Sequence, residues 1–573
     1  MNGSIQTQPV MRFVLPPGVV TETGSRLIDL ASPGNLRSGP HPATELKSPE
    51  LHGGTLGRAV SRFPWPLLLI LAVQAWLSLR LLHLDTAFAD ESLYLWVGHQ
   101  DWAHLLHGTP LPPFATYLSG SPVVYPPVAA IADSIGGLAG ARILSLCFML
   151  GATTLLWSAG ARLYGRRSAF LATALWALLG ETVRLGAFAT YDSMACFLLT
   201  LAAWCAVRAA CGSSRGALWA MGAAGALAAA NSAKYATAIF DPTVIALAAV
   251  TALTCTQSRK EATRLGAITG SYTAICLIVL LAVATARNQY YVTGLTATTL
   301  GRPAGGDSTM TILSTFWPYM KVLGPVAAVT GLACLRLERR PYRRLLILVL
   351  LGTGLVAPLN QLRIHTSTSL AKHEDFAAWF VALAVGYGLA ALMRGTRVRQ
   401  AAVLLAALAA IGASTVIGWP TAVVGDQYWP NTTQVVSVVR PLLARTDGEI
   451  LFQNASILDY YIGPAYHWDA IWERISGQGS LRLPSGRTVD DASVGSAGIP
   501  APYAAAVQAG YFKLIVLNND GTDTFDAALI PVIAHDRSYR LVARTGIFLV
   551  WEYAPQPHHS RQPRQSRHSR RHR

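Results

Sequence analysis

The sequence is dominated by a series of apolar segments, each long enough to cross a membrane. A helix needs about 20 mostly apolar residues to span the hydrocarbon core of a bilayer. Only 13% of the residues are charged, whereas a soluble domain carries about 25%. Both observations predict a polytopic α-helical membrane protein. We expect about eleven spans, near residues 64–84, 137–160, 168–186, 191–210, 216–233, 236–255, 266–286, 312–335, 344–359, 376–393 and 400–419.

The positive charges predict how these spans are oriented. The formal net charge is +16, but the basic residues are grouped in alternate loops and do not form one continuous face. By the positive-inside rule these loops are cytoplasmic, so the charge reflects membrane topology and no nucleic-acid partner is expected. The other loops, and everything after residue 420, then face outward. The clusters are Arg58 and Arg62; Arg162, Arg166 and Arg167; Arg208 and Arg215; Arg259, Lys260 and Arg264; Arg336, Arg339, Arg340, Arg343 and Arg344; and Arg394, Arg397 and Arg399.

The segments outside the membrane divide the rest of the chain. Residues 1–60 are rich in Pro, Gly, Ser and Thr without periodicity, which predicts a disordered cytoplasmic N-terminus. Residues 61–420 form the transmembrane domain, and residues 421–555 form a small extracytoplasmic α/β domain. In that domain we expect strands within 449–456, 512–520 and 539–553, and helices within 433–444, 501–510 and 524–534. Residues 556–573 form a basic disordered tail.

Three carboxylates directly follow the first apolar segment, on the outer side. They are Asp85, Asp90 and Glu91, and a pattern of apolar and aromatic residues at helical spacing continues to His107. This pattern predicts a helix that lies in the membrane interface. A carboxylate at such a place commonly caps a helix or is solvated. Here an ionised carboxylate could also act as a general base toward a hydroxyl or amine.

Further ionisable residues lie in other loops of the same predicted face. Asp192 opens one span, and a helix-capping role explains such a residue equally well. Lys234 lies at an outer turn, where snorkelling of its ammonium to the interface is the simple explanation. Arg287, Lys372 and His373 lie in later outer loops. Together the cations could hold a phosphate, and a phosphate-bearing lipid would explain a site at the interface.

The ordered set of short motifs resembles a known superfamily. It comprises the Asp90-Glu91 pair, YPP at 125–127, a helix bearing Arg142, and RLYGRR, TYDS, AKY and KHEDF further along the chain. Over residues 60–420 it resembles the membrane glycosyltransferases of the type-C superfamily. The branch is that of protein O-mannosyltransferases, aminoarabinose transferases of lipid A and related bacterial enzymes.

The resemblance implies a bacterial plasma-membrane enzyme that transfers a sugar with inversion. The donor would be a polyprenyl-phosphate-linked monosaccharide, and the acceptor an envelope polysaccharide, lipid or protein on the outer face. Asp90 matches the family's catalytic acid, with Glu91 beside it and Asp192 as the second acidic position. Substrate-binding candidates are Lys234 for the donor phosphate, Lys372 and His373 from the late loop, Tyr125 of the YPP motif, and Arg287 on charge and position alone.

We expect no required cofactor. The seven cysteines lie in or beside apolar spans, and no two have the spacing of metal ligands, so neither a zinc site nor a disulfide framework is predicted. Some type-C enzymes use a divalent cation, and Asp85, Asp90 and Glu91 could supply oxygen ligands for one. A bound metal therefore stays an open alternative.

Two other functions fit part of the pattern. A secondary transporter would have a similar number of spans, but its functional charges lie near the bilayer midplane on broken helices, and here they lie at outer ends. An outer-face polysaccharide polymerase or ligase would act on diphosphate-linked oligosaccharides. Its expected reliance on Arg and His in large loops is matched by Arg363, His365 and His373.

Overall fold

The computed structural model describes residues 64–555, with gaps at 112–113, 115–117, 119–122, 212–214, 288, 303, 428–429, 453–454, 467–474, 477–479, 483–487, 491–500 and 520–523. The N-terminal segment 1–60 and the tail 556–573, both expected to be disordered, lie outside the described residues.

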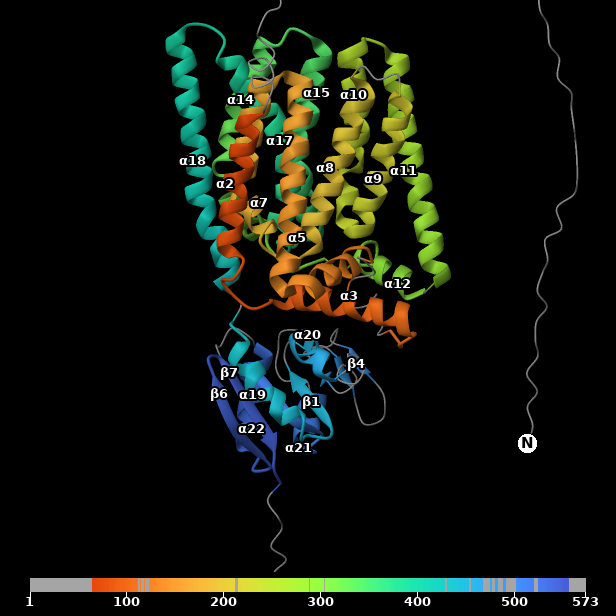
Figure 1. The fold of residues 1–573 in the computed structure, drawn as a ribbon, viewed down its shortest axis with the longest axis vertical. Coiled ribbons are helices and arrows are strands. Elements are labelled where there is room, and N and C mark those ends of the chain that lie inside the picture. The colour runs from red at the N-terminus through yellow and green to blue at the C-terminus, as the bar shows by residue number, and fades with distance from the viewer. Residues whose placement is uncertain are drawn as a thin grey trace, which may run out of the picture. The chain divides into compact units, whose positions relative to one another are not determined.

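The first part of the described chain is a helical bundle. Seven of its helices are long and apolar enough to cross a membrane, or eight if the pair α13–α14, bent by 76°, forms one span. In Figure 1, α8, α9, α10, α11 and α17 run alongside one another. The elements are α2 (Trp65–Leu81), α3 (Ala89–His107), α5 (Tyr125–Tyr164), α6 (Arg166–Ala177), α7 (Gly180–Leu185), α8 (Tyr191–Ala210), α9 (Gly216–Ala233), η1 (Tyr235–Phe240), α10 (Asp241–Thr256), α11 (Arg259–Arg287), α12 (Gln289–Thr298), α13 (Thr309–Met320), α14 (Leu323–Leu337), α15 (Pro341–Gly352), η2 (Thr353–Leu355), α16 (Val356–Ile364), α17 (Leu370–Leu392) and α18 (Arg397–Gln427).

The expectation of about eleven spans is not confirmed. All of the predicted segments are helical, but several do not form a full span. The segment 168–186 divides into α6 and α7, with 12 and 6 residues, and α2 has only 17. A helix rises about 1.5 Å per residue, so these pieces are shorter than the hydrocarbon core is thick. Apolar composition therefore located the helices but not their breaks.

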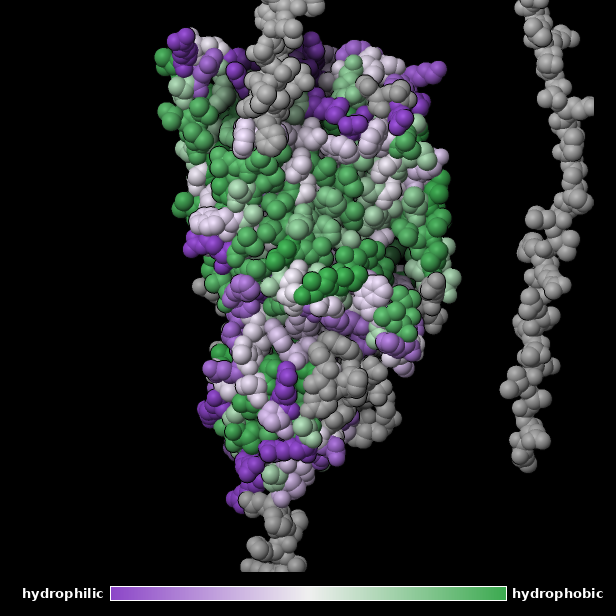
Figure 2. All heavy atoms as spheres, in the orientation of Figure 1, coloured by the Kyte–Doolittle hydropathy of each residue, from purple (hydrophilic) through white to green (hydrophobic). Residues whose placement is uncertain are grey.

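The burial of the helices separates a lipid-facing shell from a core. Figure 2 shows apolar side chains over the middle of the bundle and polar ones at its ends. In the most apolar 18-residue stretch of α11 and of α18, only 11% of the residues are buried, whereas in that of α17 89% are buried. An apolar helix that leaves such surface uncovered requires lipid around it. The central helix α17 begins at Leu370 and carries Lys372 and His373 in its first turn, where both are largely enclosed by the bundle.

The helix expected after the first apolar segment is present as α3. It lies across one end of the bundle in Figure 1. Leu95 and Trp96 are buried against the core, whereas Leu105 and Leu106 near its end are 70% and 66% exposed. Gly108 ends the helix in a left-handed conformation with φ 70°, which glycine adopts without steric cost. The helix thus packs against the bundle at its start and leaves apolar side chains exposed at its end.

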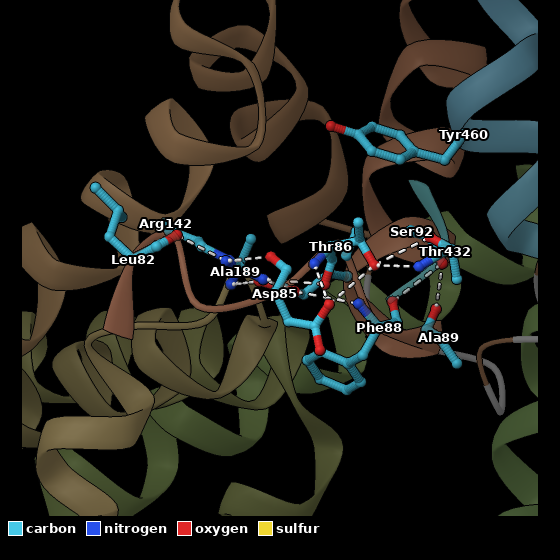
Figure 3. A network of polar contacts seen from close by, with 12 residues as sticks. Leu82, Asp85, Thr86, Phe88, Ala89, Ser92, Arg142, Ala189, Thr432 and Tyr460 are labelled. Atoms are coloured by element: carbon cyan, nitrogen blue, oxygen red, sulfur yellow. Dashed lines mark hydrogen bonds and ion pairs between the residues drawn. The ribbon is translucent and has the colours of Figure 1, made fainter. Parts of the chain in front are cut away.

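A buried ion pair holds the turn between α2 and α3 (Figure 3). Arg142 of α5 donates from Nε to Glu91 Oε1 at 2.8 Å and from Nη2 to Glu91 Oε2 at 2.7 Å. Its Nη1 also donates to the carbonyl oxygens of Leu82 and Asp85, at 2.7 and 3.2 Å. Glu91 Oε1 accepts a further bond from the Ala189 amide at 2.7 Å. One guanidinium and one carboxylate therefore tie together the turn, α5 and the chain before α8.

The C-terminal part is a small mixed α/β domain. Its sheet has the strand order β2-β1-β5-β7-β6, in which β1 pairs in parallel with β2 and β5, and β7 pairs antiparallel with β5 and β6. The expected strands are confirmed, and Gly546, with φ 60°, forms the β6–β7 turn. The elements are α19 (Thr433–Leu443), β1 (Glu449–Phe452), α20 (Ala455–Tyr466), β2 (Ile475–Ser476), β3 (Ser480–Arg482), β4 (Thr488–Asp490), α21 (Ala501–Gln508), β5 (Phe512–Asn518), α22 (Thr524–His535), β6 (Tyr539–Thr545) and β7 (Phe548–Tyr553).

This domain bonds to the same α2–α3 turn that Arg142 holds. The Ala87 amide donates to the Tyr461 hydroxyl at 2.7 Å. The Thr432 amide donates to Thr86 Oγ1 at 3.1 Å. Ser92 at the start of α3 lies 3.2 Å from the hydroxyl of Ser456 in α20. The turn is therefore held by α5 on one side and by the α/β domain on the other.

Removing the charge of Arg142 is expected to destabilise the whole bundle. In Arg142→Gln, Glu91 keeps a buried charge without its guanidinium, which typically costs about 3 to 5 kcal/mol. We expect a large drop in the Tm of the purified protein. Arg264→Gln, which removes an exposed ion pair with Glu261, serves as the control and should leave Tm unchanged. Equal Tm values for the two variants would contradict the role of the buried pair.

Loss of the Tyr461 hydroxyl is expected to loosen the α2–α3 turn without unfolding the protein. One hydrogen bond contributes about 1 kcal/mol, so amide hydrogen exchange over residues 82–88 should be faster in Tyr461→Phe. Tyr539→Phe is the matched control, because its hydroxyl donates to the Phe512 carbonyl inside the α/β domain at 2.8 Å. Unchanged exchange in Tyr461→Phe would show that this contact does not hold the turn.

Candidate active site

Four charged side chains from four helical elements form a continuous chain of ion pairs. The carboxylate of Asp192 pairs with Lys234 Nζ through Oδ1 and lies 2.9 Å from Lys372 Nζ through Oδ2. Lys372 Nζ is also 3.5 Å from Asp90 Oδ2. The order Asp90–Lys372–Asp192–Lys234 alternates in sign, so each charge has an opposite neighbour. Four candidates that are far apart in the sequence thus belong to one site.

Exposure differs sharply along this chain of charges. The Asp192 side chain is fully buried, and those of Lys234 and Lys372 are 6% and 15% exposed. The Asp90 side chain, in the first turn of α3, is 41% exposed. Asp90 is therefore the open end, where a second molecule can reach a carboxylate. Asp192 is bound on both oxygens to ammonium groups and is not free to take a proton from a substrate.

The turn that carries Lys234 is held by its own polar contacts. Lys234 follows the last residue of α9 with extended backbone, and the Thr237 amide donates to its carbonyl at 3.0 Å. Asn231 accepts from Thr237 at 2.6 Å and donates to Asp241 at 2.8 Å. Burial lowers the pKa of the Lys234 ammonium, and the charge of Asp192 opposes this effect. The residue is therefore enclosed in protein and does not snorkel to the interface.

A polar cavity of about 400 Å³ opens beside Lys234. This volume lies in the range of about 300–1,000 Å³ that is typical of ligand sites. Four basic side chains lie on its wall: Lys234, Arg302, Arg363 and His373. His373 is 7% exposed, and neither of its ring nitrogens has a hydrogen-bond partner. The wall of this cavity thus suits an anionic group.

A second cavity, of about 370 Å³ and lined mainly by apolar side chains, adjoins the first. The two share Tyr235, Ala238 and Thr299. Leu277, Leu280 and Leu281 of the lipid-facing helix α11 line the apolar cavity. A ligand with a charged head and a long apolar tail would therefore find a cationic chamber and an apolar groove side by side.

The loops around the polar cavity are joined to each other. The Gly305 amide donates to the Ile364 carbonyl at 2.9 Å, and the Asp307 amide to the His365 carbonyl at 3.2 Å. Asp307 Oδ2 accepts from the Ser367 amide at 2.6 Å. Arg302 lies just before the first of these segments and Arg363 in the last turn of α16, just before the second, and both reach the same cavity. Sequence reasoning did not select Arg302, although its place in a glycine-rich outer loop was a usable signal.

The remaining candidates lie elsewhere or outside the described side chains. Glu91 is fully buried against Arg142. Tyr125 is fully buried beside Tyr94, with ring centroids 6.2 Å apart, and is not on the described wall of either cavity. Arg287 ends α11, but its side chain is outside the described residues. The role of Arg142 was also missed, because its partners lie 51 to 60 residues away in the sequence.

The polar side chains near the start of α17 lie in different surroundings. Lys372 meets Asp192, and His373 faces the polar cavity. Glu374 and Asp375 line a separate small cavity of about 40 Å³ together with Glu181.

In the part of the chain that the structure describes, no group of three or more His, Cys, Asp or Glu side chains is arranged to hold a metal ion. Asp85 contributes its carbonyl to Arg142, and its carboxylate accepts from the Thr86 amide at 2.7 Å.

Known structures share this fold. No protein-family model and no curated protein matches the sequence. The ArnT protein of Cupriavidus metallidurans, solved with undecaprenyl phosphate bound, superposes with a TM-score of 0.55 at 13% identity, covering 87% of this chain and 98% of its own. The oligosaccharyltransferase AglB of Archaeoglobus fulgidus, in complex with an inhibitory peptide and a dolichol-phosphate, gives 0.54 at 13% identity, with 85% and 74% covered.

The arabinofuranosyltransferase AftD from mycobacteria gives a TM-score of 0.53 at 16% identity, and the match covers 85% of this chain but 40% of AftD. These three structures belong to the type-C superfamily that the short motifs resemble. At such identities the likeness establishes the architecture and leaves the substrates open. The chain therefore has the fold of a multi-pass membrane protein of the type-C glycosyltransferase kind.

Proposed function

We propose that this protein transfers a sugar from a polyprenyl-phosphate-linked monosaccharide to an acceptor on the outer face of a bacterial plasma membrane. The observation that carries this proposal is the pair of adjoining cavities, one cationic and one apolar, beside the Asp90–Lys372–Asp192–Lys234 chain. The acceptor is an envelope polysaccharide, lipid or protein. The likeness to structures bound to undecaprenyl phosphate and dolichol-phosphate supports the donor class.

The lipid donor would bind with its phosphate in the polar cavity. Lys234 and Arg302, two of the basic side chains on the cavity wall, would hold the phosphate oxygens, because charge-assisted hydrogen bonds to phosphate are strong. The polyprenyl tail would leave along the apolar cavity, past Leu277 and Leu281. Burying apolar chain surface there contributes about 25 cal/mol per Å². The sugar is then held at the interface, between lipid and water.

Asp90 would act as the general base. It is the exposed carboxylate of the charge chain, and the acceptor approaches from the aqueous side. Lys372 lies between Asp90 and Asp192 and holds the carboxylate of Asp90 toward the site. Glu91 serves a different purpose: its pair with Arg142 fixes the turn from which Asp90 projects. Asp192 would position the two lysines.

The reaction would be a single displacement at the anomeric carbon. A lone pair of the acceptor oxygen or nitrogen forms the new bond as the bond from the anomeric carbon to the phosphate oxygen breaks. The proton of the acceptor passes to Asp90, and the polyprenyl phosphate leaves with its charge stabilised by Lys234 and Arg302. One displacement inverts the configuration. Phosphate is a good leaving group, so no general acid is required.

We propose that this step needs no metal cofactor. The ammonium of Lys372 lies between the carboxylates of Asp90 and Asp192, at 3.5 and 2.9 Å. These are the two acids that a divalent ion in this site would have to share. The ammonium of Lys372 already supplies the positive charge between these two carboxylates. The alternative of a metal held by Asp85, Asp90 and Glu91 is disfavoured, because Glu91 is occupied by Arg142 and Ala189.

Sugar transfer by the purified protein in nanodiscs tests the proposed function. The assay offers labelled polyprenyl-phosphate monosaccharides with envelope acceptors, and a diphosphate-linked oligosaccharide tests the polymerase or ligase alternative. Asp90→Asn should lower transfer by about 100-fold or more, the usual contribution of a general base, while donor binding is retained. Asp101→Asn, further along the same helix, is the control and should transfer at the wild-type rate. No transfer with any donor, together with solute uptake in proteoliposomes, would refute the proposal in favour of a transporter.

The cations of the polar cavity are expected to affect donor binding more than turnover. Arg302→Ala removes one charge from the cavity wall. The KM for the donor should rise by about tenfold, because one charge-assisted hydrogen bond contributes about 1.5 kcal/mol. Arg264→Ala, in an exposed pair within α11, should leave KM unchanged. A fall in kcat at constant KM would instead place Arg302 at the reacting atoms.

A further inference from the structure

Two cysteines that are distant in the sequence meet at the far ends of two helices. Cys211 directly follows the last residue of α8, and Cys255 lies in the last turn of α10. Their Sγ atoms are 2.8 Å apart. A disulfide bond is about 2.05 Å long, so the two sulfur atoms need to approach by less than about 1 Å. Because α8 and α10 pack against each other, this requires a side-chain adjustment and no new fold.

The surroundings of the pair leave it open to small reagents. Cys255 is exposed and Cys211 is half-buried. The guanidinium groups of Arg162 and Arg343 lie within electrostatic range of Cys211 and Cys255, respectively. Positive charge raises the local concentration of anionic molecules. An anionic low-molecular-weight disulfide is therefore drawn to these thiols.

We propose that Cys211 and Cys255 form a reversible disulfide and are a site of oxidative modification. The thiolate of one cysteine attacks a low-molecular-weight disulfide and releases one thiolate from it, forming a mixed disulfide. The second cysteine then attacks the mixed disulfide and releases the other thiolate. The protein loses two protons and two electrons, and the reagent is reduced to two thiols. The positive-inside rule places this end of the bundle in the cytoplasm, where such a bond reports oxidative stress.

The position of the pair links it to the active site through two rigid helices. The first turn of α8 carries Asp192, and η1 joins the Lys234 turn to the start of α10. The disulfide would tie together the opposite ends of α8 and α10. Any motion that separates these helices while Asp192 and Lys234 stay paired is then restrained. The modification itself does not depend on the proposed sugar transfer.

Thiol labelling of the full-length protein in nanodiscs tests the proposal. After treatment with oxidised glutathione, we expect two fewer thiols to react with a maleimide-polyethylene-glycol reagent. Non-reducing peptide mapping should find a Cys211–Cys255 cross-link, and dithiothreitol should reverse both changes. Cys211→Ser and Cys255→Ser should each abolish the cross-link. Cys147→Ser, which removes another exposed cysteine, is the control and should behave like the wild type.

Peptide mapping of the oxidised wild-type protein tests for the Cys211–Cys255 disulfide even where a serine variant fails to fold. Full maleimide reactivity of Cys211 and Cys255 after oxidation would overturn the proposal. A stable glutathione adduct on either cysteine without the cross-link, or cross-links only between protein molecules, would do the same. Oxidised wild type should also have a higher Tm than the reduced form, because the cross-link restricts the unfolded chain.

Discussion

The buried pair between Arg142 and Glu91 is the interaction on which the site depends. A charge inside a membrane domain is costly unless it is paired and fully hydrogen-bonded. Both groups meet that requirement by binding the backbone around them: Arg142 binds the carbonyls after α2, and Glu91 binds the Ala189 amide. The need to satisfy two buried charges thus shapes the turn that presents Asp90. The α/β domain then secures the same turn through Tyr461 and Thr432.

The second principle of the site is alternation of charge. Asp192 is fully buried, and it is tolerated because two ammonium groups neutralise it. This arrangement leaves one carboxylate, Asp90, at the exposed end and one ammonium, Lys234, at the cavity end. The row of ion pairs thus has a carboxylate at one end and an ammonium at the other. This order matches a reaction in which a proton is taken up at one end and an anionic group departs at the other. The adjoining apolar cavity supplies the place for a lipid carrier.

The sequence predicted the helical membrane class, the helix that follows the first apolar segment and the strands of the C-terminal domain, because each depends on local composition and periodicity. It did not predict the number of spans, since the residues between α6, which ends at Ala177, and α7, which begins at Gly180, are as apolar as their neighbours and hydropathy does not mark the break. Asp90, Asp192, Lys234 and Lys372 were selected by their place at outer helix ends, and they meet in the structure.

Side-chain direction was beyond the reach of sequence reasoning. Glu91 and Asp90 are neighbours in α3, yet one faces Arg142 in the core and the other faces Lys372. Tyr125 was chosen from a motif and packs in the core, whereas Arg302 lies in an irregular loop and reaches the cavity. The contact of Cys211 with Cys255 likewise depends on which helices pack together. Such pairings are long-range, and a single sequence carries no direct signal for them.

The most direct test of the central claim is the binding of a polyprenyl phosphate to the purified protein, measured by native mass spectrometry. We expect one tightly held lipid phosphate in the wild type and clearly weaker binding in Lys234→Met, because the cavity then loses a cation from its wall. The same lipid without its phosphate should bind weakly to both proteins. Equal retention of the phosphorylated lipid by the wild type and Lys234→Met would contradict the account.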